Sequence, residues 1–123
     1  MVTMQELNSK NYTLTEEQKL NLGKLYIAIN NIRTAYGKSM KVTSGVRSME
    51  DQMRINPSAP KSKHLLGAAC DISDTNGDLW KWLMVNMQLL LDNNLYLEDK
   101  AATPTWVHFQ IIGPKSGKRI FKP

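Results

Sequence analysis

The sequence offers neither a disulfide nor a membrane-spanning stretch, so the fold must be stabilised by a hydrophobic core. It contains one cysteine, Cys70, so no disulfide can form within the chain and the fold does not depend on an oxidising compartment. Its most apolar stretch, Leu79–Leu91, is interrupted by Lys81, Asn86 and Gln88, which makes it too short and too polar to cross a bilayer. The first residues form neither a basic leader nor an apolar signal core. We therefore expect synthesis in the cytoplasm, no stable membrane insertion, and action outside the cell only after release.

The composition excludes a disordered chain. Hydrophobic residues make up 41% and charged residues 22% of the 123 residues, which is ordinary for a folded protein. This length suits one hydrophobic core, so we expect a single domain over residues 1–123, and a monomer. The net charge of +5 favours a polyanionic partner such as nucleic acid, an anionic membrane or an acidic wall polymer, but a solvated basic surface explains it equally well. Aromatic and basic residues are not interleaved as in single-strand binders, so nucleic acid is not expected.

The hydrophobic spacing predicts an α+β fold. Thr13 and Glu16 form a capping-box pattern ahead of apolar residues at helical spacing, and Gly37 suits a helix end, so a helix is expected over about 14–36. A second long helix begins at Gly77 or Asp78. The other expected elements are strands at 41–44, 68–72, 95–98 and 105–112, and a short helix from Ser48 that ends before Pro57. Together they predict a small antiparallel sheet packed against helices, with a loop at 56–63 and a polar tail over the surface.

Two histidines and one aspartate suggest a metal site. Zinc favours nitrogen, sulfur and carboxylate ligands in a tetrahedron, and a catalytic zinc keeps one position open for water. His64, Asp71 and His108 could supply three ligands, and Gly67 lets the chain turn between the first two. Cys70 precedes Asp71 on a predicted strand, so it should point to the opposite face as a small buried residue. Spacing alone is a weak indication, because most isolated histidines are surface or core residues.

The residues around these positions are more specific. The run from Ser62 to Asp71 matches all five fixed positions of the motif SxHxxGxAxD, and on this basis the chain resembles the LAS-type zinc peptidases. That superfamily includes D-Ala-D-Ala dipeptidases and carboxypeptidases, phage endolysins that cut L-Ala-D-Glu, and the hedgehog signalling domain. Upstream, Thr43–Ser48 resembles the family's SGYRS-like segment, and downstream Trp106–His108 resembles its third-ligand segment. The sequence TPTWVH at Thr103–His108 is similar to that of short phage-type peptidases, and the three segments occur in family order.

This resemblance implies a hedgehog/D-Ala-D-Ala-peptidase-like fold and a Zn²⁺-dependent peptidase acting on peptidoglycan stem peptides, as an endopeptidase or a D-Ala-D-Ala-type carboxypeptidase, with the endopeptidase weakly favoured. It assigns metal binding to His64, Asp71 and His108, and it assigns substrate binding and stabilisation of the transition state to Arg47. A fixed cation beside an amide carbonyl stabilises the developing oxyanion. Ser62 would line the substrate site, although a serine there also suits a turn. The basic charge and small size fit an endolysin-like enzyme that reaches the anionic cell wall once the membrane is breached.

The chain departs from the family at the general base. Many members carry Glu or Asp three residues before the third ligand, where this chain has Thr105, which cannot accept the proton. Strand alternation places Tyr96 and Glu98 on the face of His108, and Asp99 on the core face or in the turn. We therefore predict Glu98 as the base, with Asp99 as the alternative; the hedgehog domain also places its carboxylate elsewhere. The second hypothesis, which the absence of a carboxylate at position 105 supports, is a non-catalytic zinc-binding module of the same fold. The third hypothesis is a basic nucleic-acid-binding domain.

Overall fold

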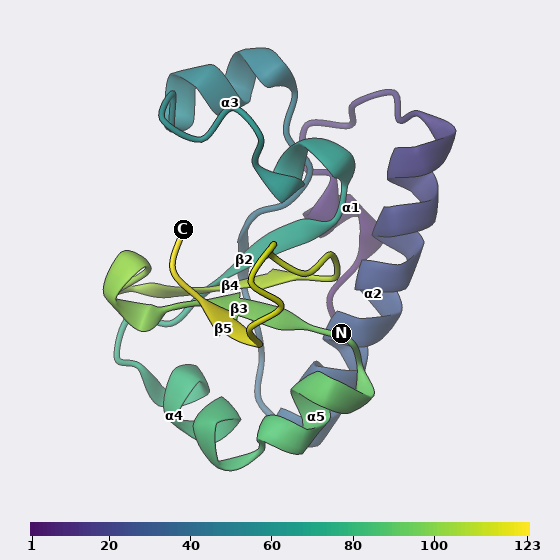
Figure 1. The fold of residues 1–123 in the computed structure, drawn as a ribbon. Helices are drawn as coiled ribbons and strands as arrows, with labels where there is room; N and C mark the ends of the chain where they lie inside the picture. Colours follow the sequence, from purple (N-terminus) through teal and green to yellow (C-terminus); the bar gives the residue numbers. More distant parts are fainter.

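The structure is a computed structural model that describes residues 1–123. Five α-helices, two short 3-10 helices and five strands follow one another along the chain (Figure 1). They are α1 (Met4–Leu7), α2 (Glu16–Tyr36), β1 (Val42–Ser44), α3 (Met49–Ile55), η1 (Lys63–Leu66), β2 (Ala69–Ser73), α4 (Asp78–Val85), α5 (Met87–Asp92), β3 (Tyr96–Glu98), η2 (Lys100–Ala102), β4 (Trp106–Gln110) and β5 (Ile120–Phe121). The α+β class expected from the sequence is confirmed. No helix combines the length and apolar character needed to span a bilayer.

The five strands form one sheet in the order β1-β2-β4-β3-β5. β1, β2, β4 and β3 pair antiparallel, as the sequence predicts, whereas β5 pairs parallel to β3. The sheet is therefore mixed, with one parallel edge. β2 and β4 pair along their full lengths, and their register places Asp71 directly opposite His108. Residues directly opposite each other on one face of a sheet are close enough for their side chains to touch.

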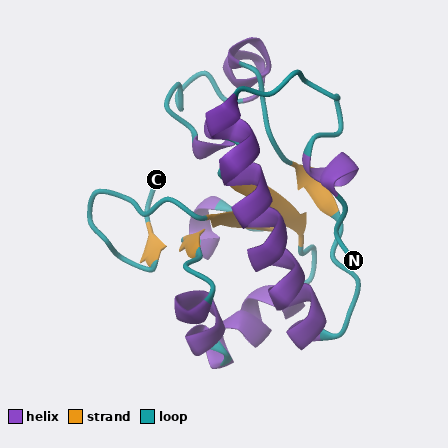
Figure 2. Ribbon diagram, turned by 90° about the vertical axis from the view of Figure 1, so that its right-hand side faces the viewer, coloured by secondary structure: helices purple, strands orange, loops and turns teal.

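The two faces of the sheet have different compositions. On the face covered by α2, alternate strand residues are apolar and fully buried, namely Cys70, Ile72, Leu97, Val107 and Phe109. They pack with Leu22, Leu25, Ile29 and Ile32 of α2, which crosses the sheet in Figure 2. Each such side chain contributes about 1.5–3 kcal/mol when removed from water. The alternate residues face the other side of the sheet, and Asp71, Glu98, His108 and Gln110 among them are polar.

The helix α2 begins two residues later than the sequence predicts. Thr15, not Thr13, caps it: the Thr15 hydroxyl accepts a hydrogen bond from the Gln18 N–H, and the Gln18 side chain accepts one from the Thr15 N–H. At the other end Gly37 adopts φ 75°, a left-handed conformation that glycine reaches without strain, as expected of a C-cap. The sequence therefore predicts a capping box in the right region, but the capping residue is Thr15 instead of Thr13.

Two further segments differ from the sequence-based expectation. The second long helix is divided into α4 and α5 at Asn86, whose side chain donates to the Trp82 carbonyl at 2.8 Å and so competes with the helical hydrogen bonds. The tail is not merely a polar covering. Ile120 packs against the core and β5 pairs with β3, which covers the edge that β3 would otherwise expose.

Candidate active site

Three side chains far apart in the sequence meet on the polar face of the sheet. His64 comes from η1, Asp71 from β2 and His108 from β4, and all three are buried. One ligand atom from each lies within 4.8 Å of the others. His64 Nε2 is 3.4 Å from Asp71 Oδ2, and His108 Nδ1 is 2.9 Å from Asp71 Oδ1. Ligands of a tetrahedral zinc lie about 3.3 Å apart for bonds of about 2.05 Å, so the two distances from histidine to Asp71 are close to the spacing that zinc requires.

The opposite nitrogen of His64 is held by the backbone. His64 Nδ1–H donates to the Gly45 carbonyl at 2.7 Å, which leaves Nε2 as the nitrogen that faces Asp71. Gly45 itself packs against α1: a Cβ at this position would lie 2.0 Å from the Leu7 carbonyl oxygen. A glycine is therefore required for the backbone to reach His64. An outer hydrogen bond of this kind fixes the tautomer and the ring orientation of a metal-binding histidine.

His108 is oriented in the same way by a side chain. Gln110 Nε2 donates to the Ile112 carbonyl at 2.7 Å, so the amide oxygen of Gln110 must face His108. His108 Nε2–H donates to that oxygen at 2.8 Å. In the neutral ring the proton is thereby placed on Nε2 and the lone pair of Nδ1 is directed toward Asp71, whereas the protonated ring also donates a hydrogen bond from Nδ1 to Asp71. Both histidines thus present one free nitrogen to the same point, which is the donor set that a metal ion such as zinc requires.

The electrostatics of the cluster favour an ionised carboxylate. Burial alone raises the pKa of Asp71, but the hydrogen bonds to His108 and His64 outweigh it and hold the pKa of Asp71 well below its ordinary value. Burial lowers the pKa of His108, yet the hydrogen bond to Asp71 and the charges of Asp71 and Glu98 outweigh burial, so the pKa of His108 is raised. Asp71 is therefore a carboxylate throughout the neutral pH range, as a metal ligand must be.

Arg47 lies beside the cluster and is tightly held. Its Nε donates to Ser44 Oγ at 2.9 Å, and its Nη1 donates to Gln52 Oε1 at 2.8 Å. Nη2 lies 3.4 Å from Asp71 Oδ2, which makes a partly buried ion pair. Burial lowers the pKa of Arg47 from its ordinary value, and the charges of Asp71 and Glu98 oppose this effect. A guanidinium remains charged under these conditions, so Arg47 is a fixed cation next to the candidate metal ligands.

A cavity of about 900 Å³ opens over the three residues. Glu98 and Arg47 line it together with the cluster, whereas Thr105 and Asp99 do not. Extending the register Tyr96↔Gln110 and Leu97↔Phe109 by one residue places Glu98 level with His108. The Asp99 carboxylate instead accepts the Ala101 N–H at 3.0 Å and begins η2.

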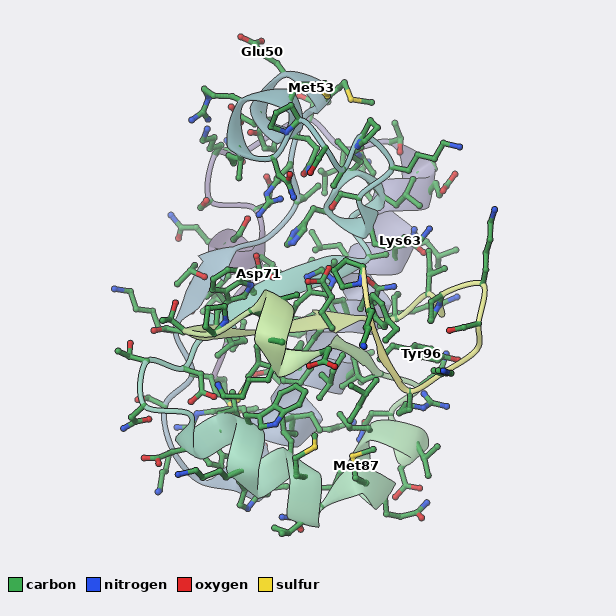
Figure 3. The ribbon with its side chains drawn as sticks, turned by 60° about the vertical axis from the view of Figure 1, so that its left-hand side comes forward. Glu50, Met53, Lys63, Asp71, Met87 and Tyr96 are labelled. Atoms are coloured by element: carbon green, nitrogen blue, oxygen red, sulfur yellow. The ribbon has the colours of Figure 1, made fainter.

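Ser62 serves the site in two ways. Its hydroxyl accepts the His64 N–H at 3.2 Å, which caps η1, and the residue also lines the cavity. The turn role and the substrate-site location considered from the sequence therefore coexist. Lys63, the next residue, also lines the cavity. Figure 3 labels Lys63 and Asp71, and shows Glu50 at one end of the molecule, away from them. The catalytic and binding roles of these residues stay predictions.

Cys70 lies where alternation places it, on the core face opposite Asp71. Burial raises the pKa of the Cys70 thiol well above its ordinary value, so the sulfur is a protonated core atom and not a ligand.

Three residues of the site have no role in the sequence-based prediction. Gln110 was placed on the face of His108 by alternation, so its position carried a signal. Gln52 joins Arg47 to the Asn56 and Ala59 carbonyls, and nothing in a short helical segment marks such a link. Phe121, from the presumed surface tail, lines the cavity because β5 folds back along β3.

An α+β fold with two histidines and a carboxylate at the floor of a cavity, and with a fixed arginine and a second carboxylate in its walls, defines a candidate metallohydrolase. The chain belongs to the Peptidase M15 family, whose model matches residues 2–104. The fold is similar to the crystal structure of Serratia marcescens L-Ala D-Glu endopeptidase ChiX, with a TM-score of 0.52 and 19% identity over 91% of this chain and 99% of that chain. These findings confirm the resemblance to LAS-type peptidases. A comparison with curated proteins gives no match.

Proposed function

We propose that this chain is a zinc-dependent endopeptidase that hydrolyses peptide bonds in the stem peptides of bacterial peptidoglycan. The observation that carries the proposal is the cluster of His64, Asp71 and His108 at the floor of a cavity whose walls hold Glu98 and Arg47. Membership of the Peptidase M15 family supports peptide-bond hydrolysis. The similar fold of an L-Ala D-Glu endopeptidase supports an internal bond of a wall peptide over a terminal one.

His64, Asp71 and His108 would hold the zinc ion. Bound there, zinc would supply a Lewis acid for the scissile carbonyl and lower the pKa of water to near neutrality. Each residue is prepared for this task by its surroundings. The Gly45 carbonyl and the Gln110 amide set the histidine tautomers, and the ionised Asp71 balances positive charge.

Glu98 and Arg47 supply the remaining chemistry from the walls of the cavity. Glu98 accepts the proton of the attacking water at a carboxylate oxygen and then returns it to the leaving amine. Arg47 donates hydrogen bonds to the oxygen of the carbonyl as negative charge develops on it. Since Ser44 and Gln52 already fix two of its nitrogens, Arg47 loses little further freedom when it binds substrate.

The charge of the cavity suits a substrate that carries carboxylates. Its walls hold more cationic than acidic side chains: Arg47, Lys61, Lys63 and Lys122 against Asp71 and Glu98. Stem peptides contain free carboxylates, and the wall around them is anionic, so a protein of net charge +5 is attracted to it. We also propose that the enzyme reaches this substrate after release from the cytoplasm, and that it acts as a monomer.

The direct test is mass spectrometry of muropeptides after purified peptidoglycan is incubated with the protein. We expect a released peptide fragment whose mass identifies one internal bond; a single released amino acid would indicate a carboxypeptidase instead. Chelation should stop the reaction and added zinc should restore it. Glu50→Gln is the matched control for Glu98→Gln, because Glu50 is exposed on α3 and does not line the cavity.

The outcomes also distinguish the two rival functions. Zinc binding without any wall cleavage would favour the non-catalytic module. Binding of nucleic acid that survives physiological salt, without cleavage, would favour the third hypothesis, because unspecific binding through scattered basic residues weakens steeply with salt. Cleavage that persists undiminished in the chelated protein would contradict the metal-dependent mechanism.

A further inference from the structure

The end of the chain contributes to the candidate active site from beyond the region that the family model matches. The matched region stops at residue 104, whereas residues 119–123, called here the 119–123 segment, return along β3. The Leu97 N–H donates to the Arg119 carbonyl at 2.9 Å, and the Asp99 N–H donates to the Phe121 carbonyl at 2.7 Å. Figure 1 shows β5, in yellow, beside β3. The segment is thus paired with the strand that carries Glu98.

Side-chain contacts anchor this pairing. The Arg119 guanidinium lies over the Tyr96 ring, 4.1 Å from its centroid, and Nη1 donates to the Leu95 carbonyl at 3.0 Å. The same ring packs against Gly113, where a Cβ would come within 2.8 Å of it. A cation over an aromatic face is attracted by the negative charge of the ring face. The segment is therefore held in place at its first residue.

Adjacent residues of β5 face opposite sides of the sheet. Ile120 packs against the hydrophobic core, and Phe121 faces the cavity. Phe121 is paired with Glu98 across the parallel strands, and its ring lies edge-on to His108, with centroids 6.4 Å apart and an interplanar angle of 84°. One aromatic ring therefore stands next to both a candidate metal ligand and the proposed base.

The exposed part of this ring faces a cavity that is mostly polar. Phe121 is half-buried, and most of the other residues around the cavity are polar or charged. Apolar surface that faces water is unfavourable, and covering it with an apolar group of a ligand is favourable by about 25 cal/mol per Å². A substrate whose reacting carbonyl lies near His108 would bring the side chain of a flanking residue against this ring.

We propose that Phe121 is a specificity-determining residue: its ring contacts the apolar side chain of the substrate residue next to the scissile bond. The inference rests on the proposed function and names a contact within the same site. Among stem-peptide residues we expect alanine at this position, because its side chain is a single methyl group with no polar atom. Removal of one methyl group costs about 0.8 kcal/mol of apolar contact, roughly a fourfold change in kcat/KM.

The test is a glycine scan of the substrate. Synthetic stem peptides with each alanine replaced in turn by glycine are compared with the unchanged peptide, on the zinc-loaded wild type and Phe121→Ala. For the wild type we expect kcat/KM to fall roughly 4- to 10-fold at one position. In Phe121→Ala we expect kcat/KM for the unchanged peptide to fall by a similar factor and the difference between the peptides to disappear. Phe121→Leu should restore part of both.

Two variants of the same tail serve as controls, with zinc content and thermal midpoint measured for every protein. Lys118→Ala is exposed and outside the cavity, so it should keep the wild-type values. Ile120→Ala, on the opposite face of β5, should lower the thermal midpoint but keep the discrimination. Should Phe121→Ala not fold, Phe121→Leu decides, since a changed wall shape must shift the peptide ratio.

Three outcomes would overturn the inference. These are a wild type that cleaves all the peptides equally, Phe121 variants that keep the wild-type discrimination, and an equal loss of discrimination in Ile120→Ala, which would make the segment merely structural. A wild type that cleaves no stem peptide at all contradicts the proposed function itself, so the two failures are distinguishable.

Discussion

The two halves of the sheet carry different parts of the site. β2 and β4 are central, five residues long, and paired along their full lengths. They hold Asp71 and His108, both buried. β3 and β5 are three and two residues long and lie on one side of the sheet, with β5 as the edge strand. They hold Glu98 and Phe121, both half-buried.

Under the proposed function, this difference separates the residues that would bind metal from those that would govern reactivity and specificity. Central strands with buried faces open least, so ligands on them keep a fixed spacing. Short strands at the side of a sheet are less constrained, so substitutions on them should leave the metal site intact. The relocation of the proposed base from position 105 to Glu98 is consistent with this division. Variants on the two halves should therefore fail in different ways.

The largest effect is expected on the central strands. His108→Ala removes one metal ligand and leaves the buried Asp71 without its closest partner, so activity should be abolished. In the wild type, zinc at about 1,000 times its Kd adds about 4 kcal/mol of stability, on the order of 10 °C in thermal midpoint. Calorimetry with and without zinc checks this: the midpoint of His108→Ala should not respond. A zinc-dependent rise equal to that of the wild type would contradict the assignment.

The next effect concerns the edge. Glu98→Gln keeps the size of the side chain but cannot accept a proton, so turnover should fall by roughly 100- to 10,000-fold. Asp99→Asn should change turnover by less than about threefold, because Asp99 caps η2 outside the cavity. Steady-state rates on a stem peptide measure both. If Asp99→Asn is the inactive variant, the base has been assigned to the wrong carboxylate.

Arg47 follows β1, which pairs with β2 on the side away from β3 and β5, and its replacement should give a smaller loss. Arg47→Ala removes a fixed donor to the developing oxyanion, and the rate should fall on the order of 100-fold with zinc still bound. Arg54→Ala is the matched control, since Arg54 is an exposed arginine on α3 that pairs with Asp51 outside the cavity. Equal rates for the two variants would show that Arg47 is structural.

Gln110 gives the smallest expected effect on the central strands. Gln110→Leu removes the acceptor that holds the His108 proton on Nε2, so zinc affinity should fall roughly 10- to 100-fold. Gln110→Glu keeps an acceptor and should retain most of the affinity. Competition with a chelator measures both affinities, and nitrogen NMR of the metal-free protein reports the tautomer of His108. Unchanged affinity in Gln110→Leu would remove the positioning role.

The sequence predicted the central half of this site better than its edge. His64, Asp71 and His108 lie in motifs with fixed spacing, and strand alternation correctly separated Cys70 from Asp71 and Glu98 from Asp99. Local signals of this kind need no knowledge of distant contacts.

What the sequence did not predict depends on partners far along the chain. The tail from Gly113 is rich in lysine, and the sequence predicts that it lies over the surface. In the structure, Ile120 packs against the core and β5 pairs with β3. The link from Gln52 to Arg47 and the approach of Gly45 to Leu7 arise only once the chain has folded. Asn86 divides a helix whose apolar spacing continues through the break.

Zinc content of Glu98→Gln and His108→Ala, measured side by side by elemental analysis after dialysis, tests the division between metal binding and catalysis most directly. We expect one zinc ion per chain in Glu98→Gln, as in the wild type, although this variant turns over little substrate. We expect none in His108→Ala. Loss of zinc from Glu98→Gln would make Glu98 a ligand, and zinc retained by His108→Ala would place the metal elsewhere; either result would contradict the division.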